Sequence, residues 1–363
     1  MTPDGSRALV ANTFGYLSVV DTATLQERQA PVCAWASGIA IAPDGQTAVV
    51  TCSDQSSVQV VDLNDLTVRR TLAVEDNPYS VAISPDGSTA YVVNFNGSAA
   101  DDHRGTVTPI VLSTGATLAH IVLSGREAIG AAITPDGRRL LVGVRGDTTN
   151  GSAVDVIDTA SGTVIGVQGD YGAPNSIAMA PDGATAYVAS PFANTITAIS
   201  PTGGTTTQRR GIAARSLAVT PDQRTLLAAD SHLVDILDLP TLSSRGYAPT
   251  DTSPAAVAVT PDQAPRAALH VGRQSGHRLS FDASASTSVS SPIARYAWNF
   301  GDGRSAVTTT PKVSHTYPRR GTYTASVTLT SRAGTSTTQV FTGQTMSRNG
   351  SSVARATVPV TVR

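Results

Sequence analysis

The stretch ISPDGSTAYVVNF, residues 83–95, contains an apolar run, a Ser-Pro-Asp-Gly turn and a second apolar run, which is the pattern of a β-hairpin. Proline presets φ at the first corner of the turn, aspartate can hydrogen-bond the following backbone, and glycine accepts a positive φ. The chain repeats this pattern in IAPDGQTAVVTC, ITPDGRRLLVGV, MAPDGATAYVAS and VTPDQRTLLAAD. A sequence that contains the same hairpin so often predicts a repeat architecture.

The turn prolines define the length of the repeat. They are Pro3, Pro43, Pro85, Pro135, Pro181, Pro221 and Pro261, separated by 40, 42, 50, 46, 40 and 40 residues. Repeats of about 40 residues made of short strands are typical of β-propeller blades with four strands each. The sequence therefore predicts an all-β fold with a propeller.

An alanine precedes six of these prolines by three positions, within segments in which small residues alternate with larger apolar ones. These alanines are Ala40, Ala82, Ala132, Ala178, Ala218 and Ala258. Blades crowd together around the propeller axis, so we expect these segments to form the innermost strands. Residues 255–260 lack outer strands of their own, and we expect them to pair beside residues 7–12. That pairing would close a six-bladed ring without a free edge, with seven blades as the alternative.

The repeats resemble the YVTN family of β-propeller repeats. AYVVNF at 90–95 and ALVANT at 8–13 match its second-strand signature most closely, and the resemblance covers residues 1–263. It implies a propeller like those of bacterial and archaeal surface proteins and, in related forms, of lactonases and streptogramin lyases. It implies little about activity, because propellers host unrelated functions.

Residues 264–363 change to an alternating pattern with glycine turns, which is typical of a β-sandwich. Trp298 and Phe300, the Gly301-Asp302-Gly303 turn, and Tyr317 followed by GTYTASVTL resemble a PKD domain, an immunoglobulin-like module of secreted bacterial proteins. The resemblance implies a non-catalytic spacer or docking module. We expect Trp298 and Tyr317 to pack in its core, with a hydrogen bond for the tyrosine hydroxyl.

Composition excludes several classes of partner. The formal net charge is −1 and the pI is near 6.6, so there is no electrostatic basis for binding nucleic acid or an anionic membrane. No apolar run is long enough to span a membrane, and MTPDGSRALV does not read as a signal peptide. The basic residues are arginine except for one lysine, an actinobacteria-like composition. The resemblances imply an extracellular or cell-surface location, with the cytoplasm as the alternative.

Cysteine and histidine usage limits the chemistry. Cys33 and Cys52 fall at the same end of one predicted hairpin, so they are candidates for a disulfide, with two separate thiols as the alternative. No histidines or cysteines have metal-ligand spacing, and no Walker, Rossmann or Gly-x-Ser-x-Gly motif occurs in context. We predict no metal and no cofactor.

Two enlarged loops, at 94–106 and 144–153, lie on the face opposite the Pro-Asp turns, and insertions on one side of a repeat ring usually mark its working face. The candidate binding residues on this face are Asp101, Asp102, Arg104, Asp147, Tyr171, Arg215 and Asp230. A solvated polar rim is the structural alternative for each of them.

Two classes of function are consistent with these features. The first is an exported or cell-surface binding protein that recognises a protein, a glycan or a small molecule through this face. The second is a small-molecule enzyme, such as a lyase, a lactonase-like hydrolase or a cyclase of secondary metabolism. In the enzyme, His103 or His232 would transfer protons, and Arg126, Arg145 or Arg215 would bind an anion.

Overall fold

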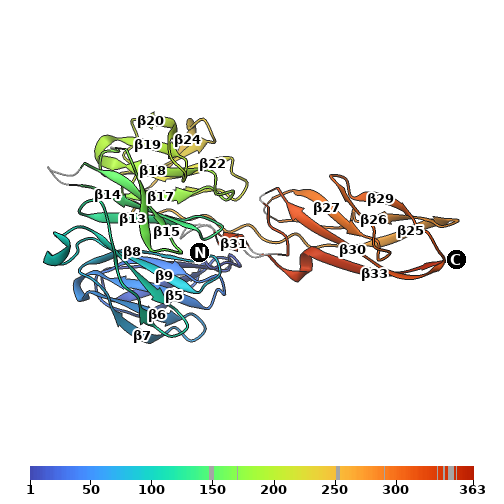
Figure 1. Cartoon of the computed structure of the whole chain (residues 1–363), viewed down its shortest axis with the longest axis horizontal. Helices are drawn as coiled ribbons and strands as arrows, with labels where there is room; N and C mark the ends of the chain where they lie inside the picture. Colours follow the sequence, from blue (N-terminus) through green and yellow to red (C-terminus); the bar gives the residue numbers. More distant parts are fainter. Residues whose placement is uncertain are drawn as a thin grey trace. The chain divides into compact units, whose positions relative to one another are not determined.

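The computed structural model describes residues 1–146, 151–169, 171–250, 254–289, 291–332, 334–337, 340–341, 347–348 and 350–363. Within these ranges the chain is all-β, with short 3-10 turns and no helix that is long and apolar enough to cross a membrane (Figure 1). The chain divides into two compact units, residues 1–261 with 341–347, and residues 262–340 with 348–363.

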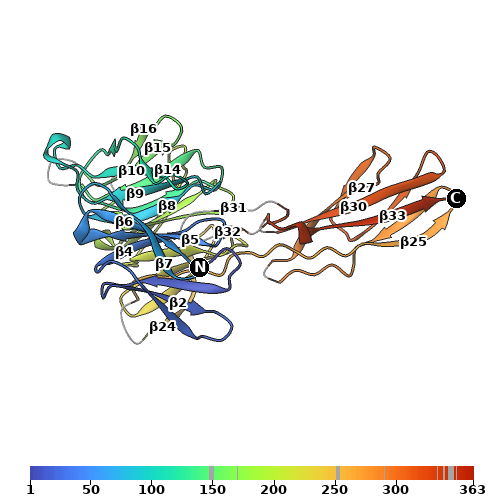
Figure 2. The ribbon, with the colours of Figure 1, turned by 90° about the horizontal axis from the view of Figure 1, so that it is seen from below.

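The first unit is a β-propeller of six sheets in its described residues, and each sheet packs against the next along the chain (Figures 1 and 2). The first three sheets contain β1 (Arg7–Ala11), β2 (Tyr16–Asp21) and β3 (Glu27–Pro31); β4 (Ala36–Ile41), β5 (Thr47–Cys52), β6 (Ser57–Asp62) and β7 (Thr67–Ala73); and β8 (Pro78–Ile83), β9 (Thr89–Asn94), β10 (Thr106–Val111), β11 (Ala116–Thr117) and β12 (Ile121–Val122). The last three contain β13 (Ala128–Ile133), β14 (Arg139–Val144), β15 (Ala153–Asp158) and β16 (Thr163–Gln168); β17 (Ser176–Met179), β18 (Ala186–Ser190), β19 (Thr195–Ile199) and β20 (Thr205–Arg210); and β21 (Ser216–Val219), β22 (Thr225–Ala229), β23 (Leu233–Asp238) and β24 (Ser243–Pro249).

The inner strands β4, β8, β13, β17 and β21 approach one another closely around the axis. A Cβ added to Gly38 would lie 2.7 Å from the carbonyl oxygen of Tyr79, and one added to Gly130 would lie 2.6 Å from that of Asn175. The equivalent residue in β17 and β21 is a serine, and the Ser176 hydroxyl accepts a hydrogen bond from the Leu217 backbone at 3.2 Å. Only small residues fit this position, because the backbone of the next blade lies against it.

Residues 255–260 do not form the predicted strand. β1 pairs with β2 alone among the described residues, and the first sheet has three strands, so the expected pairing with residues 7–12 is wrong. The Val257 N–H instead donates to the hydroxyl of Ser216 at 3.2 Å, which repeats the bond between Leu217 and Ser176. The segment therefore continues the series of inner strands through its contact with β21, without a backbone ladder to the first blade.

The Pro-Asp turns form the other face of the ring, called here the turn face. Gly45, Gly87, Gly137 and Gly183 adopt φ between 69° and 74°, as the turn chemistry predicts. The carboxylate of Asp86 accepts a hydrogen bond from the Ser88 N–H at 3.0 Å. A Cβ at Gly137 would lie 3.1 Å from the Pro85 ring, so each turn packs against the turn before it. The repeated turn residues on this face thus have a structural role.

The second unit is a sandwich of two sheets in its described residues. One contains β25 (His270–Ser275), β26 (Arg278–Asp282) and β29 (Lys312–Thr316), and the other contains β27 (Ile293–Asn299), β28 (Ser305–Thr308), β30 (Gly321–Ser331) and β33 (Arg355–Val362). A two-stranded ladder pairs β31 (Val340–Phe341) with β32 (Ser347–Arg348). Trp298, Phe300 and Tyr317 are buried between the sheets, and the Tyr317 hydroxyl donates to the Phe300 carbonyl at 3.0 Å, which confirms the predicted core.

A buried His–Asp pair supports this core. His315 Nε2 lies 2.7 Å from the carboxylate of Asp302, whose side chain is 2% exposed, and the imidazole stacks on Phe300. Burial alone would raise the pKa of Asp302, but hydrogen bonds from His315 and from the Arg304 backbone outweigh it, and the pKa is lowered. The carboxylate is therefore the form that the folded unit favours.

The glycine at the axis predicts a stability difference. Gly130→Ala should destabilise the protein by about 1–3 kcal/mol, because the added methyl group must displace the backbone of Asn175. Gly166→Ala is the matched control: it lies in β16, and its Cβ would meet only Val156, at 4.0 Å. Urea unfolding of both variants measures the difference, and equal midpoints would show that the inner strands are not closely packed.

The Asp302–His315 pair predicts acid sensitivity of the second unit. A lowered pKa in the folded state stabilises the fold above the ordinary value of 3.8 and ceases to do so as the pH falls through the folded pKa. The stability difference between the wild type and Asp302→Asn should therefore shrink from about pH 5 to about pH 2. Trp298 fluorescence in a Trp35→Phe background reports this unit alone, since the chain has two tryptophans. A difference that stays constant with pH would contradict the assignment.

Candidate functional site

The face opposite the turns, called here the loop face, carries a charged cluster over the third and fourth blades. Arg126 lies 3.5 Å from Asp102, and Arg145 lies 3.5 Å from Glu127. The Arg145 guanidinium also lies over the ring of Phe192, 4.7 Å from its centroid. The structure thus brings together several of the predicted residues in one sector, but it pairs these arginines with carboxylates.

One histidine of this sector, His120, is a residue that the sequence analysis did not single out. His120 lies between β11 and β12, with Nδ1 3.1 Å from Glu75 and Nε2 3.3 Å from Asp101. Hydrogen bonds from Ser98 and then from His120 lower the pKa of Asp101. His103 is exposed in the same loop and has a positive φ of 53°. Because both ring nitrogens of His120 face carboxylates, neither is open to a substrate.

The remaining predicted residues do not join this cluster. Arg104 is fixed by the carbonyl oxygens of Asp101 and Leu123, at 3.2 and 3.4 Å. Asp230 and His232 lie between β22 and β23 of the sixth blade, where Asp230 accepts a hydrogen bond from the Ala213 N–H at 3.2 Å. Tyr171 is 8% exposed and packs in an apolar core, so its side chain does not lie in the charged cluster. Asp147 lies outside the described residues.

Four exposed aromatic side chains lie on the loop face. Phe14 is 83% exposed, Phe192 71% and Trp35 60%, and Tyr79 is partly exposed. All four lie in loops between second and third strands or at the starts of inner strands. The other exposed aromatic residue of the described propeller is Tyr247, in the outermost strand β24. Aromatic residues are enriched at protein–protein interfaces relative to the rest of the surface.

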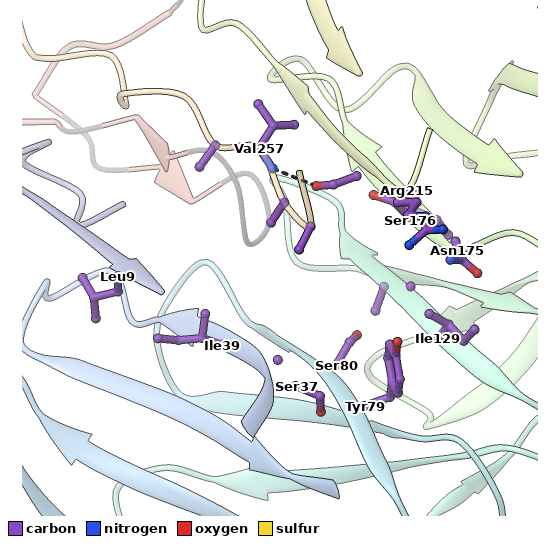
Figure 3. Close-up of a pocket in the computed structure, with 18 of the residues that line it drawn as sticks. Leu9, Ser37, Ile39, Tyr79, Ser80, Ile129, Asn175, Ser176, Arg215 and Val257 are labelled. Atoms are coloured by element: carbon purple, nitrogen blue, oxygen red, sulfur yellow. Dashed lines mark hydrogen bonds between the residues drawn. The ribbon is translucent and has the colours of Figure 1, made fainter. Parts of the chain in front are cut away.

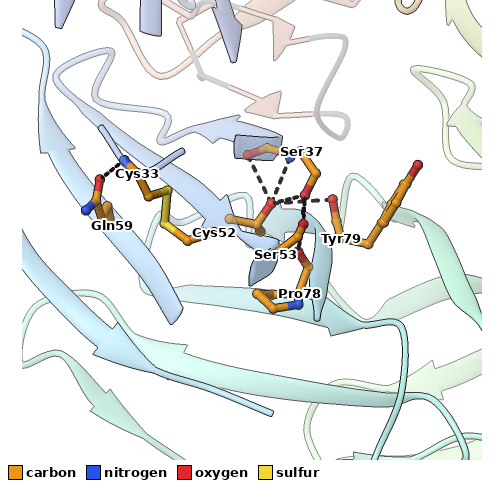
Figure 4. Close-up of a disulfide and its surroundings, with 9 residues drawn as sticks. Cys33, Ser37, Cys52, Ser53, Gln59, Pro78 and Tyr79 are labelled. Carbon is orange, nitrogen blue, oxygen red and sulfur yellow. Dashed lines mark hydrogen bonds between the residues drawn. A yellow bond between two sulfur atoms is a disulfide. The ribbon is translucent and has the colours of Figure 1, made fainter. Parts of the chain in front are cut away.

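A disulfide and a hydroxyl network hold the region around Trp35 (Figure 4). Cys33 and Cys52 are joined with an S–S distance of 2.01 Å, and both are buried. The Thr51 hydroxyl accepts from the Gly38 N–H at 2.7 Å, and the Ser53 hydroxyl donates to the Pro78 carbonyl of the next blade at 2.9 Å. Trp35 is therefore presented to solvent from a backbone that is fixed on both sides.

A cavity of about 250 Å³ lies at the axis (Figure 3). It is lined by residues of all five inner strands or their first turns, by Met1 and Leu9, and by residues 255–258. The polar lining comes from two adjacent positions of the repeat. Six residues before a turn proline the chain has Ser37, Tyr79, Asn175 and Arg215, and five residues before it has Ser80, Ser176 and Ser216; Ile129 is the apolar member of the first set from an inner strand. Inner strands run from the loop face to the turn face, so the polar end of the cavity lies on the loop face.

Metal ligands do not assemble in the part of the chain that the structure describes: no group of three or more His, Cys, Asp or Glu side chains could hold an ion there. Sequence reasoning missed His120, Glu75, Phe14, Trp35 and Phe192. Only their positions in the chain could have identified these residues, because each lies in or beside a connection on the loop face. Loop length and charge had directed attention to the two longest connections instead.

Comparison with known proteins supports the architecture. Residues 262–345 match the family described as the PKD domain. Among solved structures, Kuenenia stuttgartiensis hydrazine synthase is similar with a TM-score of 0.62 and 21% sequence identity, over 85% of this chain and 94% of that chain. No curated protein matches the chain. At this identity the likeness shows the fold alone.

The disulfide predicts a redox-dependent stability. Replacing both cysteines by alanine should destabilise the propeller by about 3 kcal/mol, because the bond closes a loop with a sequence separation of 19 residues. Dithiothreitol should lower the melting temperature of the wild type toward that of the Cys33→Ala/Cys52→Ala variant and leave the variant unchanged. An unchanged melting temperature of the wild type in dithiothreitol, although its two thiols have become titratable, would contradict this prediction.

Proposed function

We propose that the protein is an exported binding protein that recognises its partner through the loop face of the propeller, with the PKD-like unit as spacer or docking module. The observation that carries the proposal is that four of the exposed aromatic side chains, Phe14, Trp35, Tyr79 and Phe192, lie on that one face. Rigid aromatic side chains supply contact area at low entropic cost, and they dominate the energetics of many interfaces.

The surroundings of these aromatics also suit binding. The paired charges of Arg126, Asp102, Arg145 and Glu127 form a polar rim beside Phe192. Such rims direct association and fix orientation more than they add affinity. The disulfide supports an oxidising compartment, and the PKD match supports an extracellular location.

The enzyme alternative has weaker support. The described lining of the axial cavity contains no histidine and no carboxylate, so it lacks an acid–base pair. His120 is the histidine with carboxylate partners on this face, and both of its nitrogens are engaged. Binding therefore fits the loop face better than proton transfer does.

Affinity measurements on loop-face variants test the proposal. For a partner identified on glycan and peptide arrays, Trp35→Ala and Phe192→Ala should each weaken binding at least about tenfold. His103→Ala and Arg145→Ala should weaken it less, because rim residues add little affinity. Melting temperatures should remain near the wild-type value in all four.

Tyr247→Ala is the matched control, since it removes an exposed aromatic residue from the outermost strand. It should leave the affinity unchanged. A partner whose binding depends on Tyr247 or on the turn residues Asp44, Asp86 and Asp136, and not on Trp35, would overturn the proposal. So would turnover of a small molecule that is lost with His103→Ala.

A further inference from the structure

The one charged side chain in the described lining of the axial cavity is Arg215. Three other arginines of the propeller illustrate the contrast: Arg145 faces Glu127, and Arg139 and Arg209 donate to carbonyl oxygens of Pro201 and Leu242, at 3.0 and 3.1 Å. Within the described residues, the Arg215 guanidinium makes no hydrogen bond and no ion pair. Five N–H donors are thus available to a ligand at the polar end of the cavity.

Two further polar atoms of the lining have no partner among the described residues. They are the side-chain oxygen of Asn175 and the hydroxyl of Ser80, both of which are buried. A buried polar atom without a hydrogen bond is costly, and a native structure usually satisfies it with a ligand or water. The Asn175 oxygen can only accept, so its ligand must supply a donor.

Figure 3 shows how these groups are placed. Arg215, Ser176 and Asn175 lie together on one side of the cavity, and Tyr79 and Ser80 come from a different wall. The third and sixth blades, which supply Tyr79 and Arg215, are three positions apart in the ring of six, so they face each other across the axis. Two residues further along the inner strands, toward the turn face, the lining is apolar, with Ile39 and Ile177.

We propose that the axial cavity binds a small carboxylate that also carries an amide or hydroxyl donor. The planar guanidinium of Arg215 matches a carboxylate in bidentate geometry. The donor of the ligand satisfies Asn175, and a short apolar side chain enters the part lined by isoleucines. A volume of about 250 Å³ suits a group of the size of an acylated amino acid or the last residue of a peptide.

Calorimetry with N-acetyl-alanine tests the site, since this probe has a carboxylate, an amide N–H and a methyl group. A Kd on the order of 1 mM is expected for so small a ligand. N-acetyl-alaninamide, which lacks the carboxylate, should bind at least about tenfold more weakly, as should propionate, which lacks the donor. A peptide that ends in a free alanine distinguishes the two sources: binding at least as tight as that of the acid identifies a peptide C-terminus, and weaker binding identifies a free acid.

Variants locate the binding within the cavity. Arg215→Gln should weaken N-acetyl-alanine at least about tenfold, and Asn175→Leu should abolish the preference over propionate. Arg245→Gln is the matched control, because Arg245 lies in the same blade and pairs with Asp238 at 3.3 Å outside the cavity. The control should bind as the wild type does.

Absence of heat with every probe up to about 10 mM would overturn the inference, as would equal binding by wild type and Arg215→Gln. The inference rests on the proposed function only because the cavity opens on the loop face, where the partner is proposed to bind. Loss of probe binding with intact partner affinity would therefore refute the cavity site alone. Loss of Trp35-dependent partner binding with intact probe binding would refute the proposed function alone.

Discussion

The close approach of successive inner strands around the axis is the constraint on which the rest of the propeller depends. Gly38 and Gly130 leave no room for a Cβ, and Ser176 and Ser216 use the same position to bind the next strand through a hydroxyl. Small residues at this position allow the backbones of neighbouring inner strands to approach closely. One position earlier along the chain, toward the loop face, the residues are Ser37, Ile129, Asn175 and Arg215, and they line the axial cavity.

The sequence predicted the features that local chemistry determines. The glycine of each Pro-Asp-Gly turn adopts a positive φ, and the spacing of the turn prolines gives the length of one blade. The turn conformation and the blade length therefore both follow from the order of the residues. The pairing of residues 255–260 does not follow from the order of the residues. Their composition matches an inner strand, but whether a backbone ladder forms with β1 depends on contacts between distant segments, and Val257 is held by Ser216 instead.

The candidate site was predictable to the level of a face. Loop length indicated the sector in which Arg126 and Arg145 lie, yet residue identity could not tell a paired arginine from a free one. Arg215 differs from them only in its neighbours, which topology supplies. Tyr171 differs in another way. Its place near the loops suggested a ligand contact, but its ring is packed in the core.

Two properties of the loop face suggest how it works. Its exposed aromatics and paired charges suit a broad contact, whereas Arg215 and Asn175 suit a single small group at the centre. A partner that inserts a carboxylate at the axis and rests on Trp35 and Phe192 would use both. The separation of the two sets of residues lets each contribution be measured by itself.

The most direct measurement of this account is the NMR spectrum of the arginine side-chain Nε–H groups during titration with N-acetyl-alanine. The account predicts that one signal shifts in proportion to saturation, and that this signal is the one missing from the Arg215→Gln spectrum. Signals that remain unchanged, or shifts spread over Arg126, Arg145 and other surface arginines, would contradict it, because they would show that the axis offers no free guanidinium to a carboxylate.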